Sequence, residues 1–326
     1  MSHSLLRPLF KNLGTYTRRK SVNHIIREIK WHINLSEYAK ETVNFVDEVF
    51  GTDKSWLDEF VTIYKKEIGL PFTCLYNPEL INSTMLNKLV NAGVSQINIG
   101  IQTGSDYIRN SIFHRPGKNK DIINIANEIA GMGANIVYDL IIDNPYDTEE
   151  SLKDTITLLL QLPKPLSFYL FSLQYFPNYP LTRKAIEDGH IKIEDASVDS
   201  LMERATKNFD FVPKRLPFNK KQMLQNIIWL VAWGHAADRT VKYAVFNNSL
   251  GAKLCLNYMN YKAIVFGKIF GIGGIVDKLV WSRYLIAGFK YILKGDIKSL
   301  YLKIKKRITV EAITEGQAKA KASGRR

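Results

Sequence analysis

Two apolar-rich stretches of this sequence each end in a group of polar side chains. Residues 95–101 and residues 135–142 have the length and composition of buried β-strands. Hydroxyl, amide and carboxylate groups lie at or just after their ends, on Gln102, Thr103, Ser105, Asp139, Asp143 and Asn144. Such groups can hold a ligand by hydrogen bonds, and Gly100 and Gly104 would let it approach the backbone closely. In a parallel β/α fold, ligands bind at the carboxyl ends of the strands, so we expect a ligand site there.

A helix between these two strands, with further strands and helices around them, would give a β/α alternation. Residues 121–131 carry apolar side chains at helical spacing and end at Gly131. The polar run from Asp147 to Glu150 favours the start of another helix through capping and the helix dipole. The same patterns predict further strands at residues 42–49, 71–78 and 166–171, and further helices at residues 21–33, 54–68, 82–90, 181–188 and 219–235.

The polar groups and their order resemble a known family. The segment GIQTGSD, followed by a helix and then by YDLIIDNPYDTEE, is similar to the second half of a radical S-adenosylmethionine (radical SAM) barrel. The similarity is strongest to the cobalamin-associated branch, whose strands read roughly GxQSG and DxIxxxPxET. The resemblance covers residues 15–190 and implies an α/β fold. We therefore expect residues 1–190 to form a partial parallel β/α barrel, TIM-like and truncated, that lacks its first strand.

An acidic strand end is the first site feature that the resemblance implies. Residues 42–49 resemble the family strand that reads FxDD, so Asp47 and Glu48 are expected to help hold the amino group of S-adenosylmethionine. The physical reason is that an ammonium group taken out of water needs carboxylate or carbonyl partners. The alternative is a strand end with two solvated acids.

Further cofactor contacts are implied at the other strand ends. Tyr76 ends a strand whose last residues face the cofactor in relatives. The resemblance assigns the ribose or the carboxylate of the cofactor to Gln102 and Ser105. Gln174 begins a segment similar to the closing FxxxP stretch, which usually pairs with adenine, although its aromatic residues could equally form barrel wall. The remaining expected contacts are Asp143 and Asn144, in a turn that also occurs in the cobalamin-associated branch. No residue is singled out as catalytic.

The cysteines do not match the family. The sequence has two, Cys74 and Cys255, which are far apart and form no motif. Radical SAM enzymes hold a [4Fe–4S] cluster through a CxxxCxxC loop, and such a cluster takes three or four thiolates. We interpret Cys74 as a small buried apolar residue. The chain is therefore expected to be a carboxyl-terminal fragment that cannot bind the cluster alone, and cobalamin would require an amino-terminal domain that it lacks.

Positive charge is concentrated in the carboxyl-terminal part. The net charge is +14, and residues 251–310 hold twelve Lys or Arg against two acids. We expect residues 191–310 to be a basic and mostly helical region, and residues 311–326 to be a disordered tail. The basic region has two interpretations: helices packed on the barrel with a solvated basic face, or an amphipathic surface for anionic membrane or a lipid-like substrate. Nucleic acid is the weaker partner, because no binding motif interleaves the charges.

Targeting signals are missing from the sequence. The first 20 residues contain no apolar run long enough for a signal peptide, and no window of about 18 residues is free of charged or polar breaks. With 326 residues and 46% apolar composition, the chain is long enough for one barrel-sized domain and an appendage. The sequence predicts a cytoplasmic protein, with peripheral membrane association as an extension of that prediction.

Three hypotheses about function stay open at this stage. The first is a truncated or split radical SAM enzyme whose missing part, carrying the iron–sulfur cluster, is encoded upstream. The second is a degenerate relative that binds S-adenosylmethionine or a partner without radical chemistry. The third is an unrelated α/β barrel with a similar pattern of strand ends. An open barrel would also expose an unpaired sheet edge, which favours a partner that completes the sheet.

Overall fold

The computed structural model describes residues 18–35, 41–200, 202, 211–213 and 219–270. All of them belong to the first of two compact units, residues 1–272. The second unit, residues 273–326, lies outside the described residues. The predicted disordered tail and the distal part of the predicted basic helical region fall there, so both stay predictions.

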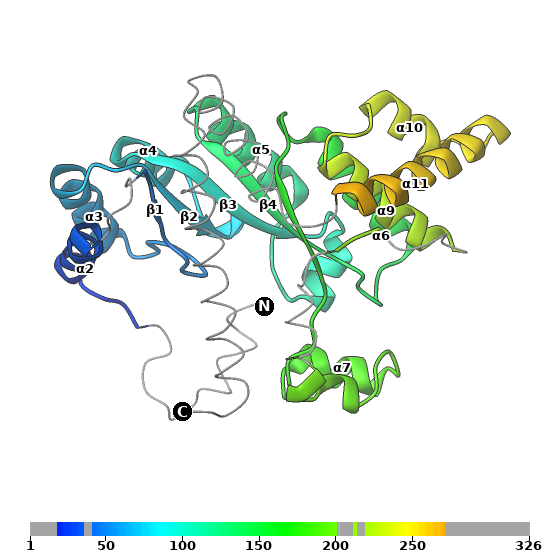
Figure 1. Cartoon of the computed structure of the whole chain (residues 1–326), viewed down its shortest axis with the longest axis horizontal. Coiled ribbons are helices and arrows are strands. Elements are labelled where there is room, and N and C mark those ends of the chain that lie inside the picture. The colour runs from blue at the N-terminus through cyan, green and yellow to red at the C-terminus, as the bar shows by residue number, and fades with distance from the viewer. Residues whose placement is uncertain (1–17, 36–40, 201, 203–210, 214–218, 271–326) are drawn as a thin grey trace, which may run out of the picture. The chain divides into compact units, whose positions relative to one another are not determined.

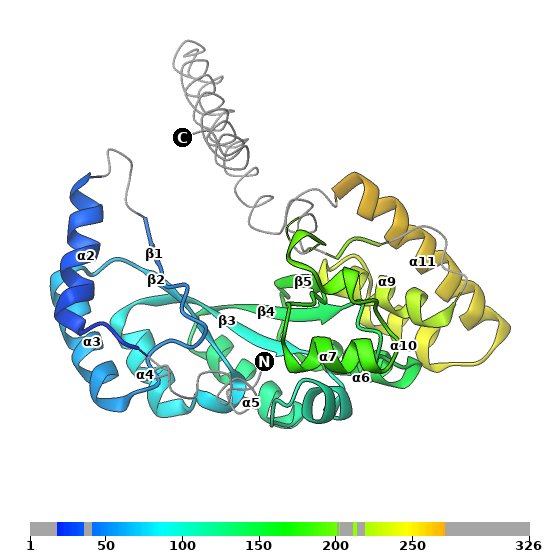
Figure 2. The same ribbon diagram turned by 90° about the horizontal axis from the view of Figure 1, so that it is seen from below.

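The first unit is built on one sheet of five parallel strands in the order β1-β2-β3-β4-β5. The strands are β1 (Val43–Asn44), β2 (Phe72–Tyr76), β3 (Val94–Gln102), β4 (Asn135–Ile142) and β5 (Phe168–Ser172). A helix connects each strand to the next, as parallel pairing requires. Figure 2 shows the strands side by side in a curved sheet, which forms a half-barrel. The expected partial β/α barrel is confirmed.

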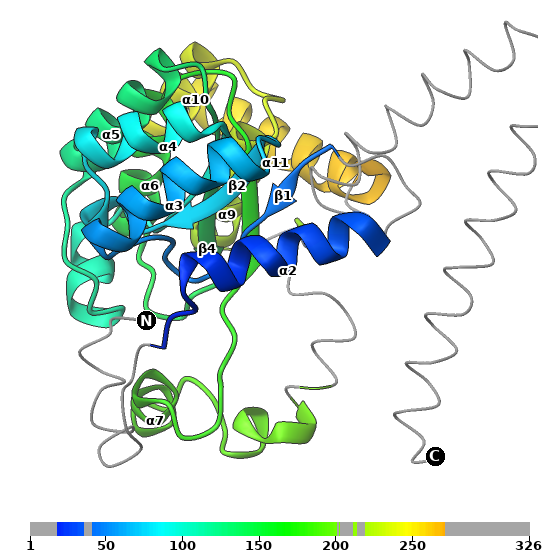
Figure 3. The same cartoon turned by 90° about the vertical axis from the view of Figure 1, so that its left-hand side faces the viewer.

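The helices accompany this sheet and continue beyond it. They are α2 (Val22–Leu35), α3 (Lys54–Glu67), α4 (Ser83–Ala92), α5 (Asn119–Gly131), α6 (Glu149–Gln161), α7 (Pro180–Glu187), α9 (Lys220–Ala232), α10 (Asp238–Phe246) and α11 (Leu250–Phe270). Short helical turns are η2 (Pro78–Leu80), η3 (Ile108–Ile112) and η4 (Glu194–Ala196). Helices α3 to α6 lie on one side of the sheet (Figure 3), and α9 to α11 follow beyond α6 (Figure 1).

The helix ends follow the sequence signals. The Asp53 side chain accepts a hydrogen bond of 2.9 Å from the Trp56 amide at the start of α3. Thr148 and Ser151 form a capping box at the start of α6. Gly93 ends α4 with φ of +100°, a conformation that favours glycine.

Alternate side chains of each strand face the helices and form the core. On β3 these are Ile97, Ile99 and Ile101, and β4 contributes Tyr138, Leu140 and Ile142 in the same layer. Burying an aliphatic side chain of this size stabilises the fold by about 1.5–3 kcal/mol. Cys74 lies in this layer as well and is 2% exposed, which agrees with its interpretation as a small buried residue.

The other set of alternate side chains faces the concave side of the sheet and is mixed in character. Its polar members are Thr73 on β2, Gln96, Asn98 and Gln102 on β3, and Asp139 on β4, and they lie next to apolar ones such as Leu75 and Ile141. These residues are half-buried, whereas the helix-facing residues are almost fully buried. The sheet therefore offers a row of hydrogen-bonding groups on the face that the helices leave free.

The helices after β5 extend the same core. Residues 224–232 of α9 are all buried, because α9 packs between α6 and α11. In this interior the Asn226 side chain donates a hydrogen bond of 2.7 Å to the Asn260 side-chain oxygen. Among the residues that the structure describes, no helix combines the length and hydropathy needed to cross a bilayer.

Two elements differ from the sequence expectation. The strand predicted at residues 42–49 is only Val43–Asn44, since among the described strands β1 has β2 as its one neighbour. Beyond Asn44, the Phe45 amide still donates to the Thr73 oxygen of β2. Helix α10 (Asp238–Phe246) was not predicted, because it has only nine residues and its N-cap position is Ala237, which gives no capping signal. The boundaries of β4, by contrast, agree with the prediction at both ends.

Candidate functional site at the carboxyl edge of the sheet

Arg115 is the centre of the polar groups on the concave face. It lies in the connection between η3 and α5 and is 8% exposed. Its guanidinium group reaches over Gly100 of β3: a methyl group at Gly100 would lie 3.5 Å from Arg115 Nη1 and 2.8 Å from Gln102 Nε2. The absence of a side chain at Gly100 therefore allows Gln102 and Arg115 to meet above the strand.

Carboxylates surround this guanidinium group. Arg115 Nη2 donates a hydrogen bond to the Asn77 side chain, and Arg115 Nε lies 4.0 Å from Glu79 Oε1. Burial lowers the pKa of Arg115, while Glu79, Asp139 and Glu48 oppose that shift through their charge. Three acids therefore act on Arg115 at the carboxyl edge of β1, β2 and β4.

Asp139 is the group in this cluster with the most altered chemistry. It pairs with Gly100 across β3 and β4, which places it beside Arg115. Burial raises the pKa of Asp139 to about 7, and the charge of Arg115 only partly offsets this. Its Oδ1 atom is buried and has no hydrogen-bond partner among the described residues. A buried oxygen of this kind is suited to a donor supplied by a ligand.

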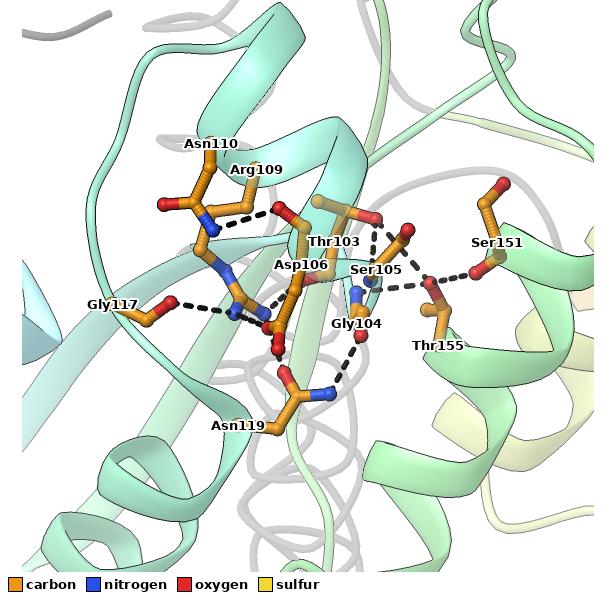
Figure 4. A network of polar contacts seen from close by, with 10 residues as sticks. All are labelled: Thr103, Gly104, Ser105, Asp106, Arg109, Asn110, Gly117, Asn119, Ser151 and Thr155. Atoms are coloured by element: carbon orange, nitrogen blue, oxygen red, sulfur yellow. Dashed lines mark hydrogen bonds and ion pairs between the residues drawn. The ribbon is translucent and has the colours of Figure 1, made fainter.

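A second polar network, centred on Arg109, anchors the segment between β3 and α5 that carries Arg115 (Figure 4). Arg109, 3% exposed, donates to the Asn119 side chain at 2.6 Å and pairs with Asp106 at 2.8 Å. It also donates to the backbone oxygen of Thr103. Because these bonds tie the end of β3 to the start of α5, Arg109 fixes the path of the chain on both sides of Arg115.

The same loop is pressed against α6 at Gly104. The Gly104 amide donates to Thr155 Oγ1 at 2.9 Å, and Asn119 Nδ2 donates to the Gly104 oxygen at 2.6 Å. Ser105, 3% exposed, lies in this loop, and its amide donates to Thr103 Oγ1 at 3.2 Å. The structure therefore places Ser105 and Thr103 in the anchoring network.

The turn after β4 forms a third polar group. Asp143 adopts a positive φ of +66°, and the next residue, Asn144, is 2% exposed and accepts a hydrogen bond from the Tyr146 amide. The Nδ2 atom of Asn144 is buried without a partner among the described residues. Burial raises the pKa of Asp147 to about 6, although a hydrogen bond from Ser151 opposes the shift. This turn thus holds buried polar groups as well as starting α6.

The other expected contacts lie apart from one another. Tyr76 is fully buried in the core on the helix side of the sheet, so the neighbouring Asn77 reaches Arg115 instead. Gln174 follows β5; its Nε2 donates to the Ser172 oxygen, and its Oε1 is buried without a partner in the described chain. Asp47 and Glu48 are exposed, and of the two only Glu48 influences Arg115.

The structure therefore brings Glu48, Gln102 and the strand residue Asp139 together around Arg115. The sequence reasoning missed Arg115, because a charged residue in a connection between helices usually faces solvent. A signal for the polar face was present, since β3 alternates amides and glycine with isoleucine: QINIGIQ. That alternation is typical of a strand with one polar face and one core face.

A parallel β/α half-barrel with a polar carboxyl edge is the class of fold and site that this geometry defines. Residues 10–159, slightly less than half of the chain, match the family model of the radical SAM superfamily. This match argues against the hypothesis of an unrelated barrel. No curated protein sequence matches the chain.

Several solved radical SAM structures are similar in fold. The methyltransferase TsrM from Kitasatospora setae has a TM-score of 0.45 at 12% identity, over 52% of this chain and 33% of that one. Coproporphyrinogen III oxidase HemN from Escherichia coli has a TM-score of 0.44 at 17% identity, over 57% and 43%. The cobalamin-dependent enzyme OxsB has a TM-score of 0.49 at 14% identity, over 90% and 51%. The chain thus spans between a third and about half of these proteins.

Of the cofactors that radical SAM enzymes use, the residues present fit S-adenosylmethionine and do not fit the [4Fe–4S] cluster. A [4Fe–4S] cluster does not fit, because the sequence has two cysteines and burial raises the pKa of the Cys74 thiol, which disfavours the thiolate a cluster needs. S-adenosylmethionine does fit: the unpaired Asp139 oxygen, Gln102 and Arg115 offer acceptors and donors at one strand edge. No residue of the described chain gives a reason to place cobalamin.

Proposed function

We propose that this chain supplies the S-adenosylmethionine-binding part of a radical SAM enzyme, with Arg115, Gln102 and Asp139 as its central contacts. The observation that carries the proposal is the buried Asp139 Oδ1 atom, which has no hydrogen-bond partner among the described residues. It lies beside the Arg115 and Gln102 side chains, which meet over Gly100. When bound in a complete enzyme, S-adenosylmethionine supplies a methyl group or radical chemistry, and the protein binds and orients it.

The charges around Arg115 suit this ligand. Glu48, Glu79 and Asp139 act on Arg115 through their charge. Arg109, which also interacts with Glu79, is itself paired with Asp106, so acids outnumber bases here and the cluster favours a cation. S-adenosylmethionine carries a sulfonium and an ammonium group against one carboxylate. We assign its ammonium or ribose hydroxyls to Asp139 and Glu48, and its carboxylate to Arg115, because guanidinium and carboxylate groups match in geometry.

The remaining expected residues have different places in this proposal. Asn144 and Gln174 each keep a buried polar atom without a described partner, so both stay proposed contacts for the far end of the ligand. Asp143 also stays a proposed contact, because it lies in the same turn as Asn144. Ser105 is proposed as a positioning residue, and Tyr76 and Asp47 stay predictions from the family resemblance.

Binding of the ligand itself is the direct test. Equilibrium dialysis with labelled S-adenosylmethionine should show saturable binding to the full chain, and Arg115→Met should weaken it by tenfold or more, because a charge-assisted contact is worth about 1.5–3 kcal/mol. Arg27→Met, on the exposed side of α2, is the matched control and should bind normally. Since Arg115 is buried, Gln102→Ala should be measured as well, with circular dichroism to confirm folding. Wild-type-like binding by both site variants would contradict the assignment.

The cluster ligands are proposed to come from a partner segment that completes the sheet. Within the part of the chain that the structure describes, strand β1 pairs with β2 alone, and a cleft of about 780 Å³ lies between its other edge and α2. The cleft is lined by Ile25 and Ile29 of α2 and by Val43 at the edge. An extended segment could add to the edge through its backbone groups and bury its side chains against α2. An amino-terminal part encoded upstream, carrying the CxxxCxxC loop, is the proposed occupant; cobalamin would require a further domain of that part.

Anaerobic reconstitution with iron and sulfide distinguishes a fragment of a radical SAM enzyme from a degenerate relative that only binds S-adenosylmethionine or a partner. The chain alone should retain no stoichiometric iron, whereas co-expression with the upstream-encoded product should give a complex with about four irons per chain. The backbone amides of Val43 and Phe45 donate to the β2 side, so the amide of Asn44 between them faces the free edge. Asn44→Pro, which removes that amide, should prevent assembly while keeping the hydrogen bonds of Val43 and Phe45 to the β2 side. If the upstream product neither binds nor brings iron while S-adenosylmethionine still binds, the degenerate binding relative becomes the better description. Four irons on the isolated chain would refute the fragment proposal.

A further inference from the structure

An aromatic and aliphatic patch covers the exposed side of α10 and α11. Its members are Tyr243, Phe246, Leu250, Leu254, Tyr258 and Tyr261, which are between 44% and 74% exposed. We call this the α10–α11 patch. The four residues on α11 recur at intervals of four, four and three, so they form one stripe along the helix. Tyr243 Oη lies 3.3 Å from Ser249 Oγ, which joins the α10 part to the start of that stripe.

The opposite side of α11 is fully used by the core. Ala252, Leu256, Met259 and Ala263 are 7% exposed or less and pack towards α9 and α10. A helix that is apolar on all sides is normally buried on all sides. The patch is therefore apolar surface that the core formed by the described residues leaves uncovered, and such surfaces usually mark an interaction site.

The charges around the patch indicate the chemistry of its partner. The 21 residues of α11 include no Asp or Glu and three Lys. Arg239 and Lys242 are exposed on α10, and Lys253 is exposed beside the stripe. The basic excess of residues 251–310 continues directly from α11 along the sequence. An acid-free apolar stripe with basic flanks is complementary to a surface that is negative outside and apolar beneath.

We propose that the α10–α11 patch docks on the surface of an anionic phospholipid bilayer. The tyrosines are suited to the headgroup level, since their rings are apolar and their hydroxyls polar. Leu250 and Leu254 would enter the acyl boundary, while Arg239, Lys242 and Lys253 contact lipid phosphates. This surface is separate from the Arg115 cluster, so the proposal does not depend on the ligand of that site.

Vesicle flotation with the full chain tests the docking surface. The probe is phosphatidylcholine vesicles in which about a third of the lipid is phosphatidylglycerol, and pure phosphatidylcholine vesicles are the comparison. The wild-type chain should float with the anionic vesicles, and binding should fall as salt is raised. Leu254→Ser combined with Tyr258→Ser should lower the partition coefficient by about tenfold or more, because two exposed apolar groups no longer enter the bilayer.

A matched control exists on α2. Trp31 and Leu35 are 59% and 62% exposed and four residues apart, like Leu254 and Tyr258 at 62% and 67%. Trp31→Ser with Leu35→Ser should float like the wild type. Any of four results would overturn the proposal: no flotation, equal binding to neutral vesicles, flotation unaffected by the Leu254 and Tyr258 pair, or a lipid-free dimer in sedimentation velocity that the same pair dissociates. The last result would identify the patch as a contact between copies of the chain.

Discussion

Replacing Gly104 by alanine is expected to lower the free energy of unfolding by about 3 kcal/mol or more. A methyl group at this position would lie 2.3 Å from the Thr155 Cα atom and 2.8 Å from the Asp154 backbone oxygen. Both atoms belong to the backbone of α6, so no side chain can rotate away to relieve the overlap. The Gly104 loop cannot retreat either, because its amide and its oxygen are bonded to Thr155 and Asn119.

Two other glycines provide controls for this prediction. Gly131→Ala, at the end of α5, meets no atom within 4 Å and should leave stability unchanged or slightly raised. Gly100→Ala would meet only the ends of the Gln102 and Arg115 side chains, so it should cost little stability but weaken S-adenosylmethionine binding. Urea denaturation followed by circular dichroism measures all three. A Gly104→Ala variant as stable as the wild type would show that α6 and the loop are not locked together.

The local elements of this fold could be predicted from the sequence because each has a signal within a few residues. The boundaries of β4 are set by an apolar run and by the polar turn that follows it, and the start of α6 is set by Thr148 and Ser151. The start of α9 is set by Asn219, whose side chain accepts a hydrogen bond from the Gln222 amide. Such signals act through neighbouring backbone groups and do not depend on the rest of the fold.

The site was harder to predict because its members meet only in three dimensions. Asn77, Arg115 and Asp139 come from three separate connections or strands, and nothing local distinguishes Arg115 from a solvated loop arginine. Its burial follows from Gly100, which lies 15 positions earlier in the sequence. Tyr76 shows a different limit. Its position at a strand end could be predicted, but the face of the sheet to which its side chain points could not, because a shift of the register by one residue would turn it to the other face.

The affinity for S-adenosylmethionine is expected to rise about fivefold to tenfold between pH 6 and pH 7.5, and Asp139→Asn should remove most of that rise. The pKa of Asp139 is raised to about 7 by burial, so at pH 6 only about a tenth of the carboxyl is ionised in the free protein. A ligand ammonium or hydroxyl prefers the ionised form, and therefore binding below pH 7 must first release a proton. The expected rise in affinity is limited to pH 7.5, because α-amino groups such as that of the ligand lose their proton, and with it their charge, near a pH of about 8.

Stability provides an independent measure of the same group. The folded-state pKa of Asp139 lies above the unfolded value of about 3.9, so the folded protein retains the proton longer than the unfolded chain. Ionisation of Asp139 therefore lowers stability as the pH rises from about 4 to about 7, by an amount on the order of 3 kcal/mol. Asp139→Asn cannot ionise, and its melting temperature should depend less on pH across that range.

Asp147→Asn is the control that ties the pH dependence of binding to Asp139. Asp147 is also buried, with its pKa raised to about 6, but it faces Ser151 in the turn before α6 and not Arg115. Its replacement should alter the pH dependence of stability and leave the pH dependence of binding unchanged. If titration calorimetry showed a flat wild-type affinity, or the same flattening in both variants, Asp139 would not be the carboxylate that holds the ligand. If only Asp139→Asn is flat, the carboxyl edge of β4 is where this chain recognises S-adenosylmethionine.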